Sequence, residues 1–269
     1  MSLPSRRRFV RAMPLAGIVG ATLPASAWSL PALQGPAAPP ADWLPRQDPV
    51  LVKEIVSVSH SNLVRVRELV ERQPALARAA VDWGYGDWET ALGAASHIGR
   101  REIAELLLAN GAHPTIFSAA MLGQLDVVRA FVAASPGVQR TLGPHGITLL
   151  AHARAGGPGA AAVLAYLESV GGADTRSPTQ PLSAADRDAV VGTYGFGSGP
   201  RDQFVIDVRN DQLGIERPGT DRRFLMHAGD LVFFPPGVPS VKIAFARDGG
   251  KVTRFTIADP QVILTATRT

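Results

Sequence analysis

An internal repeat between residues 61 and 134 constrains the fold of this chain more than any other feature. The repeat appears when the sequence is aligned on Ser61, Gly99 and Gly123. Apolar residues then recur on one helical face of each copy, whereas Arg and Glu gather on the other. The fifth position after the anchor, for example, holds Val66, Ala104 and Val128. Because glycine tolerates a positive φ, an anchor glycine suits the tight reversal between two antiparallel helices. The repeat therefore predicts successive helix pairs.

Two motifs in the second copy give the repeat a family likeness. Residues 90–95 (TALGAA) are similar to the T-P-L-H-x-A opening of an ankyrin repeat, and residues 106–114 (LLLANGAHP) are similar to its L-L-x-x-G-A-x-P ending. With a weaker fourth copy after Gly146, four copies cover residues 49–174. The resemblance implies a curved stack of about four helix pairs. In that family the concave face and the fingers bind other proteins, and no catalysis is implied.

The copies depart from the family pattern in spacing and in detail. Ala91 stands where the usual motif has Pro, and Gly93 stands where it has His. The third copy runs from His113-Pro114 directly into its first helix, which leaves no room for a β-finger. The segment VDWGYGDWET (81–90) precedes the second copy and predicts an enlarged finger, in which Gly84 and Gly86 allow a tight or bulged turn.

The carboxy-terminal third has the period of β-strands. Residues 175–181 are polar and proline-containing, which predicts a linker. Residues 182–269 alternate apolar and polar side chains, with hairpin turns expected at 210–211 and 248–250. This part resembles the small β-domain appended to serine β-lactamase-like hydrolases, through residues 191–194, 211–213, 233–235 and 245–252. The resemblance implies an accessory domain without catalytic residues. The predicted fold class is thus a multidomain α and β protein, an ankyrin-repeat stack followed by a small antiparallel β-sheet or half-barrel.

The amino terminus predicts export. Residues 1–27 combine a basic start, a short apolar run and an A-x-A site at 25–27, the layout of a cleavable signal peptide. Residues 5–11 (SRRRFVR) resemble the bacterial twin-arginine signal, and an ordinary basic signal is the alternative. Residues 28–48 then form a Pro-rich leader. The expected location is therefore periplasmic or secreted, without stable membrane insertion after the signal is removed.

Charge argues against nucleic-acid binding. The formal net charge of +4 arises from the signal segment, which holds 4 of the 27 basic residues and no acidic residue. Without that segment, 23 basic residues face 23 acidic ones, so no basic stripe for phosphates is expected. The chain has no cysteine, which excludes disulfides and thiolate chemistry.

No catalytic, cofactor or metal motif is recognisable in the sequence. The six histidines lack the i, i+4 spacing of a helical metal site, and no nucleophile–base set is visible. The sequence therefore predicts a non-enzymatic module that binds a protein partner. The alternative is a small-ligand-binding or hydrolase-associated accessory protein that acts through the β-domain. The expected partner-binding residues are Trp83, Tyr85, Trp88, Glu89, His97, Met121 and Arg154. Within the finger, Trp88 is expected to support stability and Tyr85 to support binding.

Overall fold

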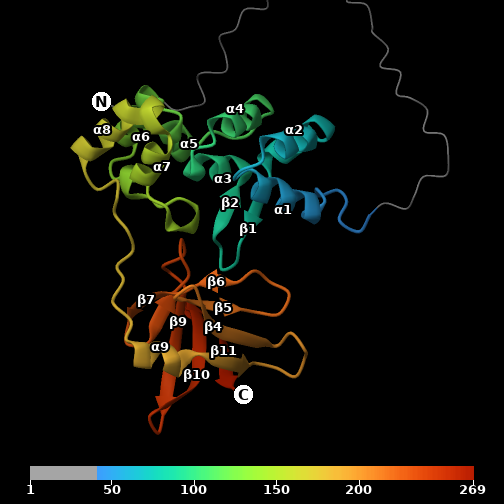
Figure 1. Cartoon of the computed structure of the whole chain (residues 1–269), viewed down its shortest axis with the longest axis vertical. Coiled ribbons are helices and arrows are strands. Elements are labelled where there is room, and N and C mark those ends of the chain that lie inside the picture. The colour runs from blue at the N-terminus through green and yellow to red at the C-terminus, as the bar shows by residue number, and fades with distance from the viewer. Residues whose placement is uncertain (1–40) are drawn as a thin grey trace, which may run out of the picture. The chain divides into compact units, whose positions relative to one another are not determined.

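The structure is a computed structural model that describes residues 41–269. The predicted signal peptide and residues 28–40 of the predicted leader lie outside the described residues. Residues 42–269 form one compact unit, with helices from residue 49 to 170 followed by strands from residue 192 onward. Figure 1 shows the helices in blue to yellow and the strands of the large sheet in orange to red.

Consecutive helices of the first part pack as pairs, α1 with α2, α3 with α4, α5 with α6 and α7 with α8. Side-chain caps explain where several begin: Asp48, Asn62, Thr90 and Thr148 each accept a hydrogen bond from a backbone N–H of the first turn. The helices are α1 (Pro49–Val58), α2 (Leu63–Arg72), α3 (Ala91–Ile98), α4 (Arg101–Ala109), α5 (Ile116–Met121), α6 (Leu125–Ala134), α7 (Leu149–Ala155), α8 (Ala161–Val170) and α9 (Ala184–Val190).

Two of the anchor glycines confirm the expected helix reversals. Gly99 and Gly123 both have a φ of 76°. A Cβ at Gly99 would lie 2.1 Å from the carbonyl oxygen of Ala155, and one at Gly123 would lie 2.0 Å from that of Gly159. Glycine is therefore required at both positions, for conformation and for the close approach of α7 to Gly99 and of the turn before α8 to Gly123.

The predicted ankyrin stack is wrong, because the described residues do not repeat one regular unit. An ankyrin unit combines a turn or finger with two helices, but only residues 80–90 form a two-stranded hairpin among the described helical elements. Residues 112–115 form a plain link instead, and residues 138–146 contain two short 3-10 turns. Helix α5 has only 6 residues. The four expected helix pairs are therefore present, but the regular ankyrin unit that the motifs of the second copy imply is not repeated along the described residues.

The predicted finger is confirmed as a hairpin. Strands β1 (Ala80–Asp82) and β2 (Trp88–Thr90) pair antiparallel, with Val81 opposite Glu89. Asp82 shapes the turn, since its Oδ1 accepts hydrogen bonds from the backbone N–H of Gly84 at 2.8 Å and of Gly86 at 3.1 Å. The tip reverses through three consecutive positive φ values, at residues 84–86.

The carboxy-terminal part is a nine-stranded antiparallel sheet, which agrees with the predicted β-domain. Its spatial order is β6-β5-β4-β3-β11-β10-β9-β8-β7. The two edge strands, β6 and β7, are separated in the chain only by Leu225, so the sheet is nearly closed. The strands are β3 (Gly192–Gly195), β4 (Gln203–Arg209), β5 (Gln212–Glu216), β6 (Arg223–Phe224), β7 (Met226–Gly229), β8 (Val232–Phe234), β9 (Lys242–Asp248), β10 (Lys251–Asp259) and β11 (Gln261–Arg268).

Local turn chemistry explains the two predicted hairpins of this sheet. Asn210 and Asp211 have φ values of 51° and 59° between β4 and β5, as a type I′ turn requires. Gly249 and Gly250 also have positive φ between β9 and β10. Inside the sheet, Tyr194, Phe233 and Phe255 are completely buried. Phe245 makes edge-to-face contacts with the rings of Tyr194 and Phe233 and a tilted contact with that of Phe255, which add to that core.

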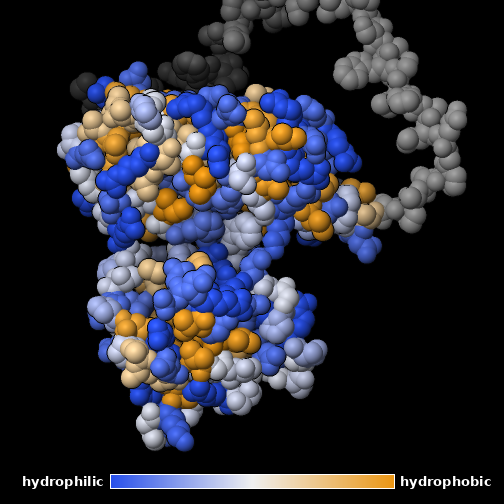
Figure 2. Space-filling model, viewed as in Figure 1, coloured by the Kyte–Doolittle hydropathy of each residue, from blue (hydrophilic) through white to orange (hydrophobic). Residues whose placement is uncertain are grey.

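The surface shows no continuous apolar belt in the view of Figure 2, where apolar residues form separate patches over the helices and over the sheet. Exposed apolar side chains on the helical part include Val64, Trp88, Val127 and Phe131. Within residues 41–269, no helix is both long and apolar enough to cross a membrane.

Candidate metal centre

Strand β2 of the hairpin places one carboxylate, that of Glu89, inside the protein. In β2, Trp88 and Thr90 face outward, whereas Glu89 between them is completely buried. This alternation follows from strand geometry, in which successive side chains point to opposite faces. A buried carboxylate is costly unless hydrogen bonds or opposite charges compensate it.

Glu89 is compensated by four nitrogen atoms. Its Oε1 lies 2.9 Å from Nε2 of His97 and 3.6 Å from Nε2 of His60. Its Oε2 accepts a hydrogen bond from Nε1 of Trp83 at 2.8 Å and lies 3.4 Å from Nε2 of His145. Three imidazoles from different segments therefore converge on one carboxylate.

Each histidine comes from the end of a helix or from a turn. His60 lies in the turn between α1 and α2, His97 in the last turn of α3, and His145 in the 3-10 turn before α7. One donor atom from each of these three and one oxygen of Glu89 all lie within 4.8 Å of one another. Nε2 of His60 and Nε2 of His97 are 3.2 Å apart.

Hydrogen bonds orient two of the rings so that Nε2 faces the cluster. Nδ1 of His60 lies 2.9 Å from the carbonyl oxygen of Ser57, and Nδ1 of His145 lies 2.7 Å from Oδ2 of Asp87. With the proton on Nδ1, a neutral imidazole presents its Nε2 lone pair inward. Histidines that bind metal ions in proteins are held by the same kind of outer hydrogen bond.

Asp87 is itself held on both oxygens. Its Oδ1 accepts a hydrogen bond from the backbone N–H of His145 at 2.9 Å, and its Oδ2 accepts one from the guanidinium of Arg223, a residue of β6. Burial alone would raise the pKa of Asp87, but the hydrogen bonds from His145 and Arg223 outweigh it and lower that pKa. Asp87 therefore stays ionised and fixes the ring of His145.

The same contacts set the charge state of the cluster without a metal ion. Burial would raise the pKa of Glu89, but hydrogen bonds to His145, His60 and His97 hold it far below its usual range. Burial would lower the pKa of His145, but its hydrogen bonds to Asp87 and Glu89 raise it to about 9. The hydrogen bond to Glu89 also raises the pKa of His60. Glu89 is thus an anion that attracts cations, whether protons or a metal ion.

The distances suit a transition-metal ion. In a tetrahedral zinc site with Zn–N distances of about 2.1 Å, neighbouring ligand atoms are about 3.4 Å apart. The separations of the Glu89 oxygens from Nε2 of the three histidines, and of His60 Nε2 from His97 Nε2, run from 2.9 to 3.6 Å, and one donor atom of each of the four residues lies within 4.8 Å of the others. A set of three imidazoles and one carboxylate is suited to Zn²⁺, Fe²⁺, Co²⁺ or Ni²⁺, whereas Ca²⁺ and Mg²⁺ require mostly oxygen ligands.

His152 is close to the cluster but outside it. Its Nδ1 lies 2.8 Å from the carbonyl oxygen of Thr148 in its own helix, and its ring packs against Phe117. Burial lowers the pKa of His152 to about 4, so the ring is neutral at neutral pH.

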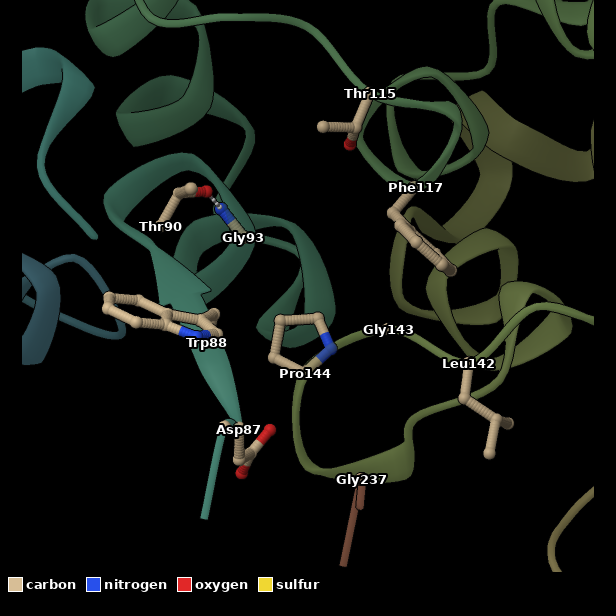
Figure 3. Close-up of a pocket in the computed structure, with 11 residues that line it drawn as sticks. Asp87, Trp88, Thr90, Gly93, Thr115, Phe117, Leu142, Gly143, Pro144 and Gly237 are labelled. Carbon is tan, nitrogen blue, oxygen red and sulfur yellow. Dashed lines mark hydrogen bonds between the residues drawn. The ribbon is translucent and has the colours of Figure 1, made fainter. Parts of the chain in front are cut away.

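Two hollows flank the hairpin. One, of about 500 Å³, is lined by three members of the cluster, His60, Glu89 and His145. The other, of about 320 Å³, is shown in Figure 3, where Trp88, Thr90 and Gly93 lie on one side and Thr115, Phe117 and Leu142 on the other. Asp87 lines this second hollow, so the residue that orients His145 borders it directly.

The structure brings together three of the seven predicted partner-binding residues: Trp83, Glu89 and His97 all belong to or contact the cluster. Trp83 and His97 both form hydrogen bonds with the carboxylate of Glu89. Met121 is completely buried, so its prediction as a partner contact is wrong for this structure. Arg154 is exposed on α7 and lies 3.6 Å from Asp174 and 3.8 Å from Glu168.

The structure reverses the expected roles of the other two. Trp88 is 62% exposed, so its ring does not support the core. Tyr85 packs against the core of the sheet, and burial raises its pKa to about 12. Tyr85 is therefore a packing residue, and Trp88 is the ring available at the surface.

Reasoning from the sequence missed the metal-type cluster and the roles of His60, His145 and Asp87. One signal could have indicated it. His60 directly precedes the anchor Ser61, His97 precedes Gly99 by two residues, and His145 directly precedes Gly146. Helix pairs that stack side by side bring equivalent reversals together, and thereby also His60 and His97, whereas His145 lies in the 3-10 turn before α7 and not at a reversal within a pair.

Compared with protein families, with curated proteins and with solved structures, the chain shows no match.

Proposed function

We propose that this protein binds one divalent transition-metal ion through His60, Glu89, His97 and His145. The observation that carries the proposal is the completely buried carboxylate of Glu89, with donor nitrogens of three histidines gathered within 4.8 Å. Zinc is the ion that this set of ligands and separations favours, and cobalt is its spectroscopic substitute.

Two outer contacts support metal binding over simple charge pairing. Asp87 and the carbonyl oxygen of Ser57 hold the rings of His145 and His60 with Nε2 toward the cluster. The rings of His60 and His145 are 30% and 29% exposed, so an ion can reach the site from solvent. When the ion binds, it replaces the protons shared among the imidazoles and Glu89.

Metal titration of the chelator-treated full chain tests the proposal. We expect one Zn²⁺ per chain by calorimetry, and an intense visible d–d absorption with Co²⁺ of the kind that tetrahedral or five-coordinate sites give. His60→Asn should lower the affinity by more than the roughly 10- to 100-fold typical of outer-sphere changes. His113→Asn is the matched control, because His113 is exposed and outside the cluster. No uptake, or equal affinities for the two variants, would mean that the cluster is an ion-paired core and no more.

A second proposed function retains the binding of a protein partner. Its support is Trp88, which is 62% exposed beside the 320 Å³ hollow of Figure 3. Exposed tryptophans are over-represented at the centres of interfaces. The partner belongs to the periplasm or the exterior if the signal of residues 1–27 acts as its resemblance implies. Crosslinking through a photoreactive group at position 88, with Phe131 as an exposed comparison site, tests it: crosslinks to the same proteins from both sites would reject Trp88 as an anchor.

A further inference from the structure

The 500 Å³ hollow beside the cluster is lined on one side by the proposed metal ligands and on the other by apolar side chains. His60, Glu89 and His145 line it, whereas His97 does not, so the coordination sphere is open toward this space. Zinc and cobalt both accept a fifth ligand. The volume lies within the range of about 300–1,000 Å³ that is typical of small-molecule sites.

Aromatic rings and a proline form the apolar side: Trp83, Phe224 and Pro236. The indole of Trp83 is held by its hydrogen bond to Glu89, and the ammonium of Lys53 lies 5.8 Å from the ring centroid. Phe224 is 45% exposed, with the guanidinium of Arg222 at 5.4 Å from its ring. These groups offer a flat apolar molecule two ring surfaces close to the cluster.

The charged side chains around the hollow are already paired with one another or with neighbours. Asp221 bonds to Lys53 at 2.8 Å, and Arg222 bonds to Asp207 at 2.7 Å. Arg223 bonds to Asp87. Among the described residues that line the hollow, every other charge is therefore balanced by a partner, and the only unbalanced charge is that of the metal centre. A doubly charged cation bound by Glu89 and three neutral imidazoles carries one net positive charge.

From this complementarity we infer that the hollow binds a small aromatic monoanion, such as an aromatic monocarboxylate, whose oxygen becomes the additional metal ligand. The ring of the ligand lies against Phe224 and Trp83, and its single negative charge neutralises the centre. This inference rests on the proposed metal binding. It adds the class of ligand, which the cluster alone does not specify.

The test uses the full chain loaded with Co²⁺ and three probes of similar simplicity: benzoate, acetate and benzamide. We expect benzoate to change the visible Co²⁺ spectrum saturably, with an affinity roughly 10-fold above that of acetate, because acetate lacks the apolar ring. Benzamide has the ring without the charge and should bind at least as weakly as acetate.

Phe224→Ala should weaken benzoate binding roughly 5-fold, since it removes one apolar wall, and leave Co²⁺ uptake unchanged. Phe131→Ala, which truncates an exposed ring on α6, is the control and should change neither. Equal affinities for benzoate and acetate, or an unaltered benzoate affinity in Phe224→Ala, would overturn the inference and leave the metal site standing. Failure to take up Co²⁺ overturns the proposed function itself and the inference with it.

Discussion

Nδ1 of His145 and Oδ2 of Asp87 form a 2.7 Å hydrogen bond between residues that are 58 positions apart in the chain. The bond joins the hairpin of β1 and β2 to the turn before α7. It also selects which nitrogen of His145 faces Glu89. The positions of both residues are therefore coupled to the geometry of the cluster.

Asp87→Asn should weaken Zn²⁺ binding by about 10- to 100-fold, the usual effect of changing an outer hydrogen-bond partner of a metal-binding histidine. The amide keeps the shape of the carboxylate but removes its charge. Chelator competition measures the affinity, and circular dichroism at 222 nm checks the fold. An effect confined to stability, with Zn²⁺ affinity unchanged, would show that Asp87 acts only as a link to Arg223.

Acid should destabilise the protein through His152. Its pKa is lowered to about 4 by burial, whereas an unfolded histidine has a pKa of about 6.5. The unfolded state therefore gains a proton first as the pH falls, and stability is lost between about pH 6.5 and 4. The full loss from this one group is about 3 kcal/mol.

Urea titrations from pH 7 to pH 4, in the presence of chelator, measure the free energy of unfolding of the parent and of His152→Asn. The difference between the two pH profiles gives the contribution of His152. Asparagine can still donate to the carbonyl oxygen of Thr148, which His152 contacts at 2.8 Å. The variant should be less stable than the parent at pH 7 and lose less stability on acidification. Parallel pH profiles would exclude His152 as the cause.

Trp88→Ala should change the free energy of unfolding by no more than about 0.5 kcal/mol, because the ring is largely in solvent. Tyr85→Ala should cost about 2 kcal/mol or more, since its ring packs against the sheet core. Denaturant midpoints with equal slopes provide the comparison. A greater loss in Trp88→Ala than in Tyr85→Ala would restore the roles expected from the sequence.

Gly99→Ala should be far more damaging than Gly137→Ala. Both glycines have positive φ, 76° and 96°, so both substitutions incur the backbone cost of roughly 1 kcal/mol. At Gly99 the new Cβ would also lie 2.1 Å from the carbonyl oxygen of Ala155, whereas at Gly137 it would meet nothing within 4 Å. Thermal unfolding of the two variants separates steric overlap from conformational strain, and equal losses would argue against close contact of α3 with α7.

Much of the local structure was predictable because it depends on neighbours in the sequence. The finger follows from Asp82 and the glycines after it, and the β4–β5 turn follows from Asn210-Asp211. The reversals at Gly99 and Gly123 follow from the repeat. The regular ankyrin stack did not follow, since only the second copy carries its motifs and the later links contain 3-10 turns.

The site was only partly predictable. The sequence predicts Glu89 and His97 as partner contacts because their segment resembles a binding finger, whereas burial in the structure gives them a different role. His60 and His145 meet them through packing of segments 29 to 56 residues away, which no local pattern encodes. The sequence predicts the helix reversals, but it does not predict the distance between them, which depends on how the helices stack.

Because the chain has no cysteine, the buried cluster is a place where a bound ion could hold its segments together. The chain can form no disulfide, so no permanent crosslink restrains its helices. An ion bound at His60, Glu89, His97 and His145 would tie together four segments spread over 86 residues. Such an ion would bind only the folded arrangement of the four segments. Local unfolding of any one of them would therefore first have to break metal–ligand bonds. The centre would then act as a reversible crosslink, and the stability it adds would increase with the concentration of free metal ion around the protein.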